Sequence, residues 1–193
     1  MRIAVTAATG RLGQATLRAL AGRVEVDQLV AVARQPERVT LPDIEARPGD
    51  YASVDEMAMA FAGVDTVIFI SAPVAGGGDR LKLHRNVISA AQQARVRKVI
   101  YTSVIGNERA AGTLFESFQA INRDTEAVLQ YAGLDWIVAR NGLYLDLDIG
   151  HIRHAEDHGG VYRNNGGAGL CGYISIAELG AGSGEVDAGG ARL

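Results

Sequence analysis

The chain has 193 residues, 48% of them hydrophobic and 21% charged, with a formal net charge of −3. This length and composition suit one globular domain whose core is large enough to fold without disulfides or metals. Apart from residues 95–98 there is no basic stretch, which argues against a nucleic-acid surface, and no apolar run could cross a membrane. Cys171 is the only cysteine and no signal-like segment precedes the first strand, so we expect a cytoplasmic protein.

The first predicted strand, residues 3–5, leads directly into the turn Thr6-Ala7-Ala8-Thr9-Gly10-Arg11-Leu12-Gly13. A strand followed by a small-residue turn lets the backbone approach a pyrophosphate, and the next helix offers unpaired N–H groups and a positive dipole end to it. The arrangement predicts a dinucleotide site at the start of the chain. Alternatively, Gly10 and Gly13 are only packing glycines of an α/β turn.

Ala7 occupies the place that the first glycine of this turn usually takes. That glycine serves the tight turn, whereas Gly10 allows close approach to phosphate and Gly13 lets helix and strand pack closely. An alanine can substitute for it only if the backbone there has a negative φ. The interpretation of the turn therefore depends on the backbone angle at Ala7.

Arg34 ends the second predicted strand, where an NAD-binding protein would carry an acid that bonds the ribose 2′-hydroxyl. An arginine there suits a 2′-phosphate, no acid stands beside it, and Arg11 and Arg38 could add positive charge. The predicted cofactor is therefore NADP(H). Alternatively, Arg34 is an ordinary solvated surface arginine.

Strand-like and helix-like segments then alternate along the chain. We predict strands at 28–33, near 44–47, and at 65–70, 98–103 and 135–139, and helices at 53–62, 80–94 and 114–132. Buried helix faces are predicted at Gly13, Leu17 and Leu20, and at Phe118, Ile121, Thr125 and Val128. The strand centres are continuously apolar, as expected when helices cover both faces of a parallel sheet. The predicted fold class is α/β, a Rossmann-type doubly wound parallel sheet.

After about Leu147 this pattern weakens, and glycine and alanine dominate from Gly159 onward. We predict an NADP(H)-binding Rossmann domain at 1–147, followed at 148–193 by the remnant of a substrate lobe. Its end, from Gly180 onward, has almost nothing to bury, so we expect a loose tail.

Three histidines, His151, His154 and His158, have spacings that could share one helical face. The segment lacks a strong carboxylate-plus-histidine motif and glycine follows at once. We therefore predict no metal site.

Further short motifs recur in order: Ala33-Arg34-Gln35-Pro36-Glu37-Arg38, Gly49-Asp50-Tyr51, Ser71-Ala72-Pro73, His84-Arg85-Asn86-Val87-Ile88, Tyr101-Thr102-Ser103, Thr125-Glu126 and Arg140-Asn141-Gly142-Leu143-Tyr144. With the glycine turn they cover about the first 145 residues. In this collinear arrangement the chain resembles the NmrA-like branch of the atypical short-chain dehydrogenase/reductase superfamily, and within it the NADPH-dependent quinone reductases.

The resemblance implies that NADPH lies along the carboxyl ends of the strands. The turn Thr6–Gly13 would hold the pyrophosphate, Arg34 the 2′-phosphate, Asp50 and Tyr51 the adenine side, Ser71, Ala72 and Pro73 the nicotinamide-side ribose, and Asn141 and Tyr144 the nicotinamide and acceptor. Alternatively, Asp50 and Tyr51 are turn residues, and Asn-Gly at 141–142 is an ordinary turn signal.

Many short-chain dehydrogenases transfer a proton through Tyr-x-x-x-Lys, but Phe118 and Asn122 stand at that spacing here. The resembled quinone reductases also lack the pair. A quinone accepts hydride directly at an electron-poor ring and the hydroquinone anion can take a proton from water, so holding the nicotinamide against the acceptor can suffice. Asn122 could hydrogen-bond an acceptor carbonyl, or it is a helix-surface asparagine.

We therefore predict an NADPH-dependent reductase that transfers hydride directly to a small quinone-type acceptor, with a homodimer left open. The related reductases continue for many tens of residues, building the lobe that covers the acceptor. Residues 172–179 resemble the segment that rejoins the core, but residues 180–193 do not resemble the family, so the chain looks shortened or altered. The alternatives are a non-catalytic, redox-sensing regulator of NmrA type that binds NADP(H), and a truncated inactive reductase.

Overall fold

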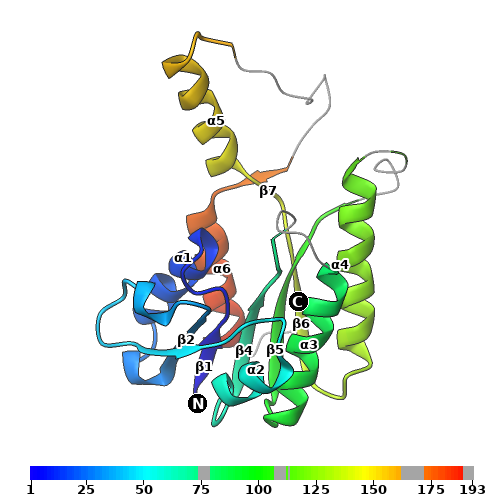
Figure 1. Cartoon of the computed structure of the whole chain (residues 1–193). Coiled ribbons are helices and arrows are strands. Elements are labelled where there is room, and N and C mark those ends of the chain that lie inside the picture. The colour runs from blue at the N-terminus through cyan, green and yellow to red at the C-terminus, as the bar shows by residue number, and fades with distance from the viewer. Residues whose placement is uncertain (74–78, 107–111, 113, 162–171, 189–193) are drawn as a thin grey trace.

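The computed structural model of the chain describes residues 1–73, 79–106, 112, 114–161 and 172–188. Within these ranges a parallel sheet lies between two layers of helices (Figure 1). Cys171 and the last residues of the predicted tail, 189–193, lie outside the described residues.

The main sheet has six strands in the order β3-β2-β1-β4-β5-β6, and every neighbouring pair is parallel. The strands are β1 (Ile3–Val5), β2 (Leu29–Ala33), β3 (Glu45–Pro48), β4 (Thr66–Ile70), β5 (Lys98–Val104) and β6 (Asp135–Asn141). This confirms the predicted Rossmann-type sheet. The chain order reverses between β1 and β4, so the crevice beyond their carboxyl ends is the topological switch point at which such sheets bind ligands.

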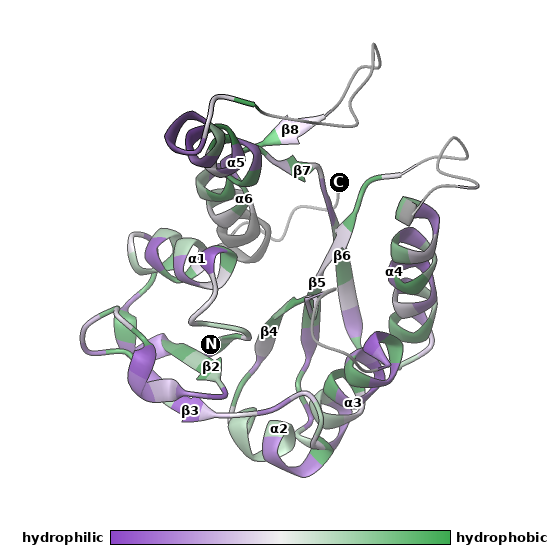
Figure 2. Cartoon of the chain, turned by 45° about the horizontal axis from the view of Figure 1, so that its top comes forward, coloured by the Kyte–Doolittle hydropathy of each residue, from purple (hydrophilic) through white to green (hydrophobic). Residues whose placement is uncertain are grey.

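The helices are α1 (Arg11–Ala21), α2 (Val54–Ala60), α3 (Arg80–Gln93), α4 (Leu114–Gln130), α5 (Leu145–Asp157) and α6 (Ile176–Ala188). All of them except α5 form one layer on each face of the sheet. Figure 2 shows α1 and α6 on one side of the sheet and α3 and α4 on the other. The strands alternate accordingly: Phe69 packs with residues of α2, α3 and α4, whereas its neighbour Ile68 packs with residues of α1 and α6.

The buried face of α4 differs from the predicted one. Of the four positions expected to face the sheet only Thr125 is fully buried, and the other fully buried residues at 115–130, where burial is described, are Asn122, Glu126 and Leu129. Hydrophobic periodicity predicted a buried face of α4 that is shifted by one residue from the observed one, because three of these four buried side chains are polar. They are accommodated by hydrogen bonds to β5, α3 and β6.

The expected loose tail is wrong at residues 180–188, which belong to helix α6. Ser175 and Glu178 form a capping box at its start: the Glu178 amide donates to Ser175 Oγ, and the Ser175 amide donates to the Glu178 carboxylate. Leu179 is buried in the core, and Gly180 lies against the backbone of α1, where a Cβ would come within 2.7 Å of the Ala15 carbonyl carbon. Part of the predicted second segment, 148–193, thus packs on the Rossmann sheet.

Beyond β6 the chain leaves the sheet. Two short strands, β7 (Leu143–Tyr144) and β8 (Tyr173–Ile174), pair in parallel, and α5 extends away from the sheet after β7 (Figure 1). None of the residues of α5 is buried. None of the helices in the described residues is long and apolar enough to span a membrane.

Candidate functional site

The turn after β1 leaves the N-terminus of α1 open. The Ala8 amide donates to the Val32 carbonyl of β2 (3.1 Å), and the Gly10 amide donates to the Ala7 carbonyl (2.9 Å), which shapes the turn. Gly10 is the N-cap residue, no side chain caps the helix, and its first turn contains no acid. The first-turn N–H groups and the positive end of the helix dipole are therefore available to an anion.

Gly13 and Ala7 are in direct contact across this turn. A Cβ at Gly13 would lie 2.4 Å from the Ala7 carbonyl oxygen and 2.9 Å from Ala8 Cα, so only glycine lets α1 approach β1 this closely. Ala7 itself has a φ of 48°, in the left-handed region. The negative φ that an unstrained alanine requires is therefore absent, and the Ala7 Cβ destabilises this conformation by about 1–2 kcal/mol.

Arg34 follows β2 directly and its side chain is exposed at the carboxyl edge of the sheet. Arg11 and Arg38 are exposed as well, and Arg38 donates to the Gln35 side chain at 2.9 Å. These arginines place positive charge along the edge where α1 begins. Both interpretations of Arg34, a 2′-phosphate ligand and a solvated side chain, are compatible with its exposure.

Thr6 and Tyr51 make internal contacts at the ends of β1 and β4. The Tyr51 hydroxyl lies 2.5 Å from Thr6 Oγ1 and 2.7 Å from the Ile70 carbonyl oxygen, and the Ile70 amide donates to Thr6 Oγ1 (3.0 Å). Burial raises the pKa of the Tyr51 hydroxyl above its ordinary value. The Asp50 carboxylate accepts from the Ala52 amide (2.9 Å), as in a turn. These contacts join the strand ends, and the adenine-side roles of Asp50 and Tyr51 remain predictions.

The loop after β4 is tied to both β5 and α3. The Ser71 amide donates to Thr102 Oγ1 at 3.0 Å. The Ala72 amide donates to His84 Nε2 at 2.9 Å, and the Ala72 carbonyl accepts from Arg80 Nε at 2.7 Å. Segment 71–73, predicted to face the nicotinamide-side ribose, therefore has a defined main-chain position at the switch point.

Asn141, the last residue of β6, lies next to Tyr144 of β7. The Asn141 side-chain amide donates to the Tyr144 hydroxyl at 3.4 Å, and the Asn141 carbonyl accepts from the Ile105 amide at 2.9 Å. Burial raises the pKa of the Tyr144 hydroxyl. The two residues predicted to approach nicotinamide and acceptor are thus neighbours at one edge of the sheet.

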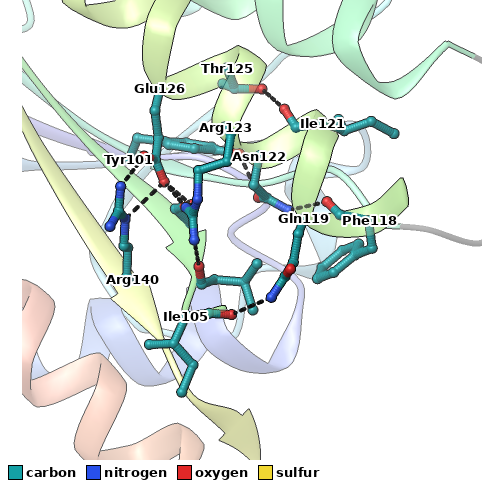
Figure 3. Close-up of polar contacts among 12 residues, drawn as sticks. Tyr101, Ile105, Phe118, Gln119, Ile121, Asn122, Arg123, Thr125, Glu126 and Arg140 are labelled. Atoms are coloured by element: carbon teal, nitrogen blue, oxygen red, sulfur yellow. Dashed lines mark hydrogen bonds and ion pairs between the residues drawn. The ribbon is translucent and has the colours of Figure 1, made fainter. Parts of the chain in front are cut away.

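Asn122 is buried, with only 1% of its surface exposed. It accepts from the Tyr101 hydroxyl and donates to the Phe118 carbonyl, each at 2.8 Å (Figure 3). The helix-surface alternative is therefore wrong, because the amide is part of a polar network within the core. Its role in positioning a substrate remains a prediction.

Glu126 joins three elements at the same end of the sheet (Figure 3). Its carboxylate accepts from Ser103 Oγ at 2.5 Å and from Arg140 Nη2 at 2.6 Å, and it pairs with Arg123. Burial alone would raise its pKa, but the hydrogen bonds from Arg140 and Ser103, with the two arginine charges, outweigh burial and hold the pKa below its usual value. The network fixes the carboxyl ends of β5 and β6.

Sequence reasoning assigned no role to Arg80, and His84 appeared only within a motif. The sequence shows that the two residues are four apart, on one face of a predicted helix. It does not show their common partner, which is the main chain of Ala72, because an alanine side chain has no polar group to indicate such a role.

Residues 7–166 match a family model described as NAD(P)H-binding. The chain belongs to this NAD(P)H-binding family. It is 30% identical over 187 residues to quinone oxidoreductase 2 of Escherichia coli, covering 95% of this chain and 63% of that protein. It is also 30% identical over 155 residues to an NmrA-like family domain-containing oxidoreductase of Aspergillus flavus, covering 76% of this chain and 49% of that protein.

The triphenylmethane reductase of Citrobacter sp., solved in complex with NADP(H), has a similar structure, with a TM-score of 0.86 at 30% identity over 96% of this chain and 65% of that chain. These likenesses confirm the resemblance indicated by the motifs and the prediction of a nicotinamide dinucleotide as cofactor. The chain spans less than two thirds of the length of each of these relatives.

Proposed function

We propose that this NAD(P)H-binding protein is an NADPH-dependent reductase that transfers hydride directly to a quinone-type acceptor. The observation that carries the proposal is the uncapped N-terminus of α1, which opens at the switch point with Arg34 at the end of the adjacent strand β2. An open helix terminus suits a pyrophosphate, and a neighbouring arginine suits a 2′-phosphate. The relatives named as a quinone oxidoreductase and an NADP(H)-complexed reductase support the same choice.

The residues present fit the cofactor. The turn Thr6–Gly13 presents backbone N–H groups without a competing acid, Arg34 is exposed for a 2′-phosphate, and segment 71–73 faces the same crevice end. When bound, NADPH supplies the hydride for the reaction. The chain itself binds and orients the cofactor and the acceptor and excludes water, which is what a hydride transfer requires of the protein.

No proton relay through a Tyr–Lys pair is needed for this chemistry. Phe118 and Asn122 occupy the relay spacing, and the nearby Tyr101 hydroxyl is used internally, donating to Asn122. Burial raises the pKa of Tyr101 to about 12, which makes it a poor acid at neutral pH. The proton that completes the hydroquinone therefore comes from water.

A second candidate is a non-catalytic NADP(H)-binding regulator. The observation that favours it is that Asn122 and Tyr101 satisfy one another inside the core, leaving neither polar group for an acceptor. Such a regulator needs the same phosphate site and no acceptor pocket. A cytoplasmic location is a further prediction that applies to both candidates, and a homodimer is left open for both.

The deciding experiment combines a binding titration of NADPH with an NADPH oxidation assay against a panel of small quinones. A reductase binds NADPH and oxidises it when a quinone is present, whereas secondary alcohols with NADP+ give no reaction. Stoichiometric binding without turnover by any quinone would favour the regulator or a truncated inactive reductase. Failure to bind NADPH would refute both candidates.

A further inference from the structure

Both main-chain groups of Ala72 are held by side chains of α3. The Ala72 amide donates to His84 Nε2 (2.9 Å) and its carbonyl accepts from Arg80 Nε (2.7 Å). His84 is completely buried and Arg80 is 7% exposed. Because residues four apart lie on the same helix face, the two side chains hold one peptide segment from the same side. We call this arrangement the Arg80–His84 clamp.

The surrounding hydrogen bonds define the protonation state of His84. Thr125 Oγ1 donates its proton to the Ile121 carbonyl (2.8 Å; Figure 3), so His84 Nδ1, 2.8 Å from the same oxygen, must be the donor to it. Nε2 is then the unprotonated nitrogen and accepts from Ala72. Burial, together with the Arg80 charge, lowers the pKa of His84 to about 3, which keeps this acceptor available at neutral pH.

A neutral donor would be enough to hold the Ala72 carbonyl, but Arg80 is charged. Its guanidinium lies over the Phe118 ring, 4.6 Å from the centroid, and Nη1 is buried with no hydrogen-bond partner among the described residues. A buried, incompletely satisfied charge is unfavourable for folding. A contribution to stability therefore does not by itself account for the Arg80 guanidinium beside segment 71–73.

We propose that the Arg80–His84 clamp positions segment 71–73 for the nicotinamide half of the dinucleotide. The clamp acts at the carboxyl end of β4, beside the β1 turn, where the switch point places the ligand. The proposal rests on the proposed function only in requiring that NADP(H) binds. It does not require that any acceptor is reduced.

The test compares two ligands by calorimetric titration: NADP+, and adenosine 2′,5′-bisphosphate, which lacks the nicotinamide half. In Arg80→Met and His84→Met we expect NADP+ to bind about tenfold more weakly or worse, the loss expected for a hydrogen bond to a charged or buried group. The affinity for adenosine 2′,5′-bisphosphate should stay at the wild-type value. The exposed neighbour Arg85→Met serves as the matched control and should change neither ligand.

Two further measurements separate positioning from general stability. His84→Gln keeps a carbonyl acceptor near the Nε2 position, so its NADP+ affinity should recover toward the wild-type value. If His84→Met does not fold, Arg80→Met carries the test of the expected loss. Arg80→Met removes a poorly satisfied charge but also the donor to the Ala72 carbonyl, so the two effects on Tm oppose one another and Tm should change little while NADP+ binding falls.

Equal weakening of both ligands in the clamp variants, or unchanged NADP+ affinity, would overturn the clamp. Wild-type protein that binds adenosine 2′,5′-bisphosphate no more weakly than NADP+ would also overturn it, because no nicotinamide-half recognition then exists. If the clamp variants show the selective loss but the wild-type protein reduces no quinone, the clamp stands and the reductase proposal fails. If the wild-type protein binds neither ligand, both fail.

Discussion

At Ala7 a single methyl group strains the turn that begins the cofactor site, because its φ is 48°. We predict that Ala7→Gly raises the free energy of unfolding by up to about 1 kcal/mol, since relief of roughly 1–2 kcal/mol of left-handed strain exceeds the roughly 0.4–1 kcal/mol lost to a more flexible unfolded chain. NADPH binding should tighten as well. Urea denaturation and a binding titration measure the two effects.

Ala8→Gly is the matched control for this substitution. Ala8 is fully buried and is not one of the residues with positive φ, so the same change should lower the free energy of unfolding by about 1 kcal/mol. Equal losses for both variants would show that Ala7 is not strained.

Arg34 tests the choice between the two nicotinamide dinucleotides. Arg34→Ala should weaken NADPH binding by about 1.5–3 kcal/mol, the range for a charge-assisted hydrogen bond, and should change NADH binding little. Arg18→Ala removes another exposed arginine, on α1 away from its N-terminus, and controls for net charge. If Arg34→Ala weakens both dinucleotides equally, the side chain does not bind the 2′-phosphate.

At the scale of elements, the packing of α6 on α1 is the feature that sequence composition concealed. Gly180 lies where a Cβ would meet the Ala15 carbonyl carbon at 2.7 Å and the Thr16 nitrogen at 2.9 Å, whereas a Cβ at Gly182 would have no neighbour within 4 Å. Gly180→Ala should therefore lower the free energy of unfolding by about 1–3 kcal/mol through overpacking. Gly182→Ala should raise it by about 0.5–1 kcal/mol through helix propensity.

Chemical denaturation of the two variants checks this contrast on one helix. If both substitutions stabilise the protein, α6 does not pack on α1 in solution, and the expectation of a loose tail would be restored.

For the whole molecule, the buried His84 predicts loss of stability in acid. Its pKa is about 3 in the folded protein against an ordinary 6.5, so below pH 6.5 the unfolded chain binds a proton that the folded chain does not. The stability from neutral His84 is complete above pH 6.5 and declines as the pH falls toward 3. Between pH 7 and pH 5 the loss is on the order of 2 kcal/mol.

Urea denaturation at the two pH values measures this loss, and His84→Gln is the control because glutamine does not titrate. The variant should lose less stability than the wild type over the same interval, by roughly the same 2 kcal/mol. Identical pH dependence in both proteins would mean that His84 titrates normally in the folded state.

The class of fold and the position of the cofactor turn follow from the amino-acid sequence alone, because both depend on local patterns. The continuously apolar run at residues 66–70 indicates a buried parallel strand, and Gly10 and Gly13 follow β1 at the spacing that opens a helix. The capping box at Ser175 and Glu178 is equally local, and it indicates the start of α6 despite the glycines that follow.

The partners of the polar side chains in the site, in contrast, follow only from the folded structure. Tyr51 and Asn122 were both predicted to face a ligand, yet Tyr51 bonds to Ile70 of β4 and Asn122 bonds to Tyr101 of β5 inside the protein. The positive φ of Ala7 and the clamp on Ala72 likewise depend on segments that meet only in the folded chain. Periodicity and motif spacing describe one segment at a time, whereas burial and hydrogen-bond satisfaction are set by what a second segment places opposite it.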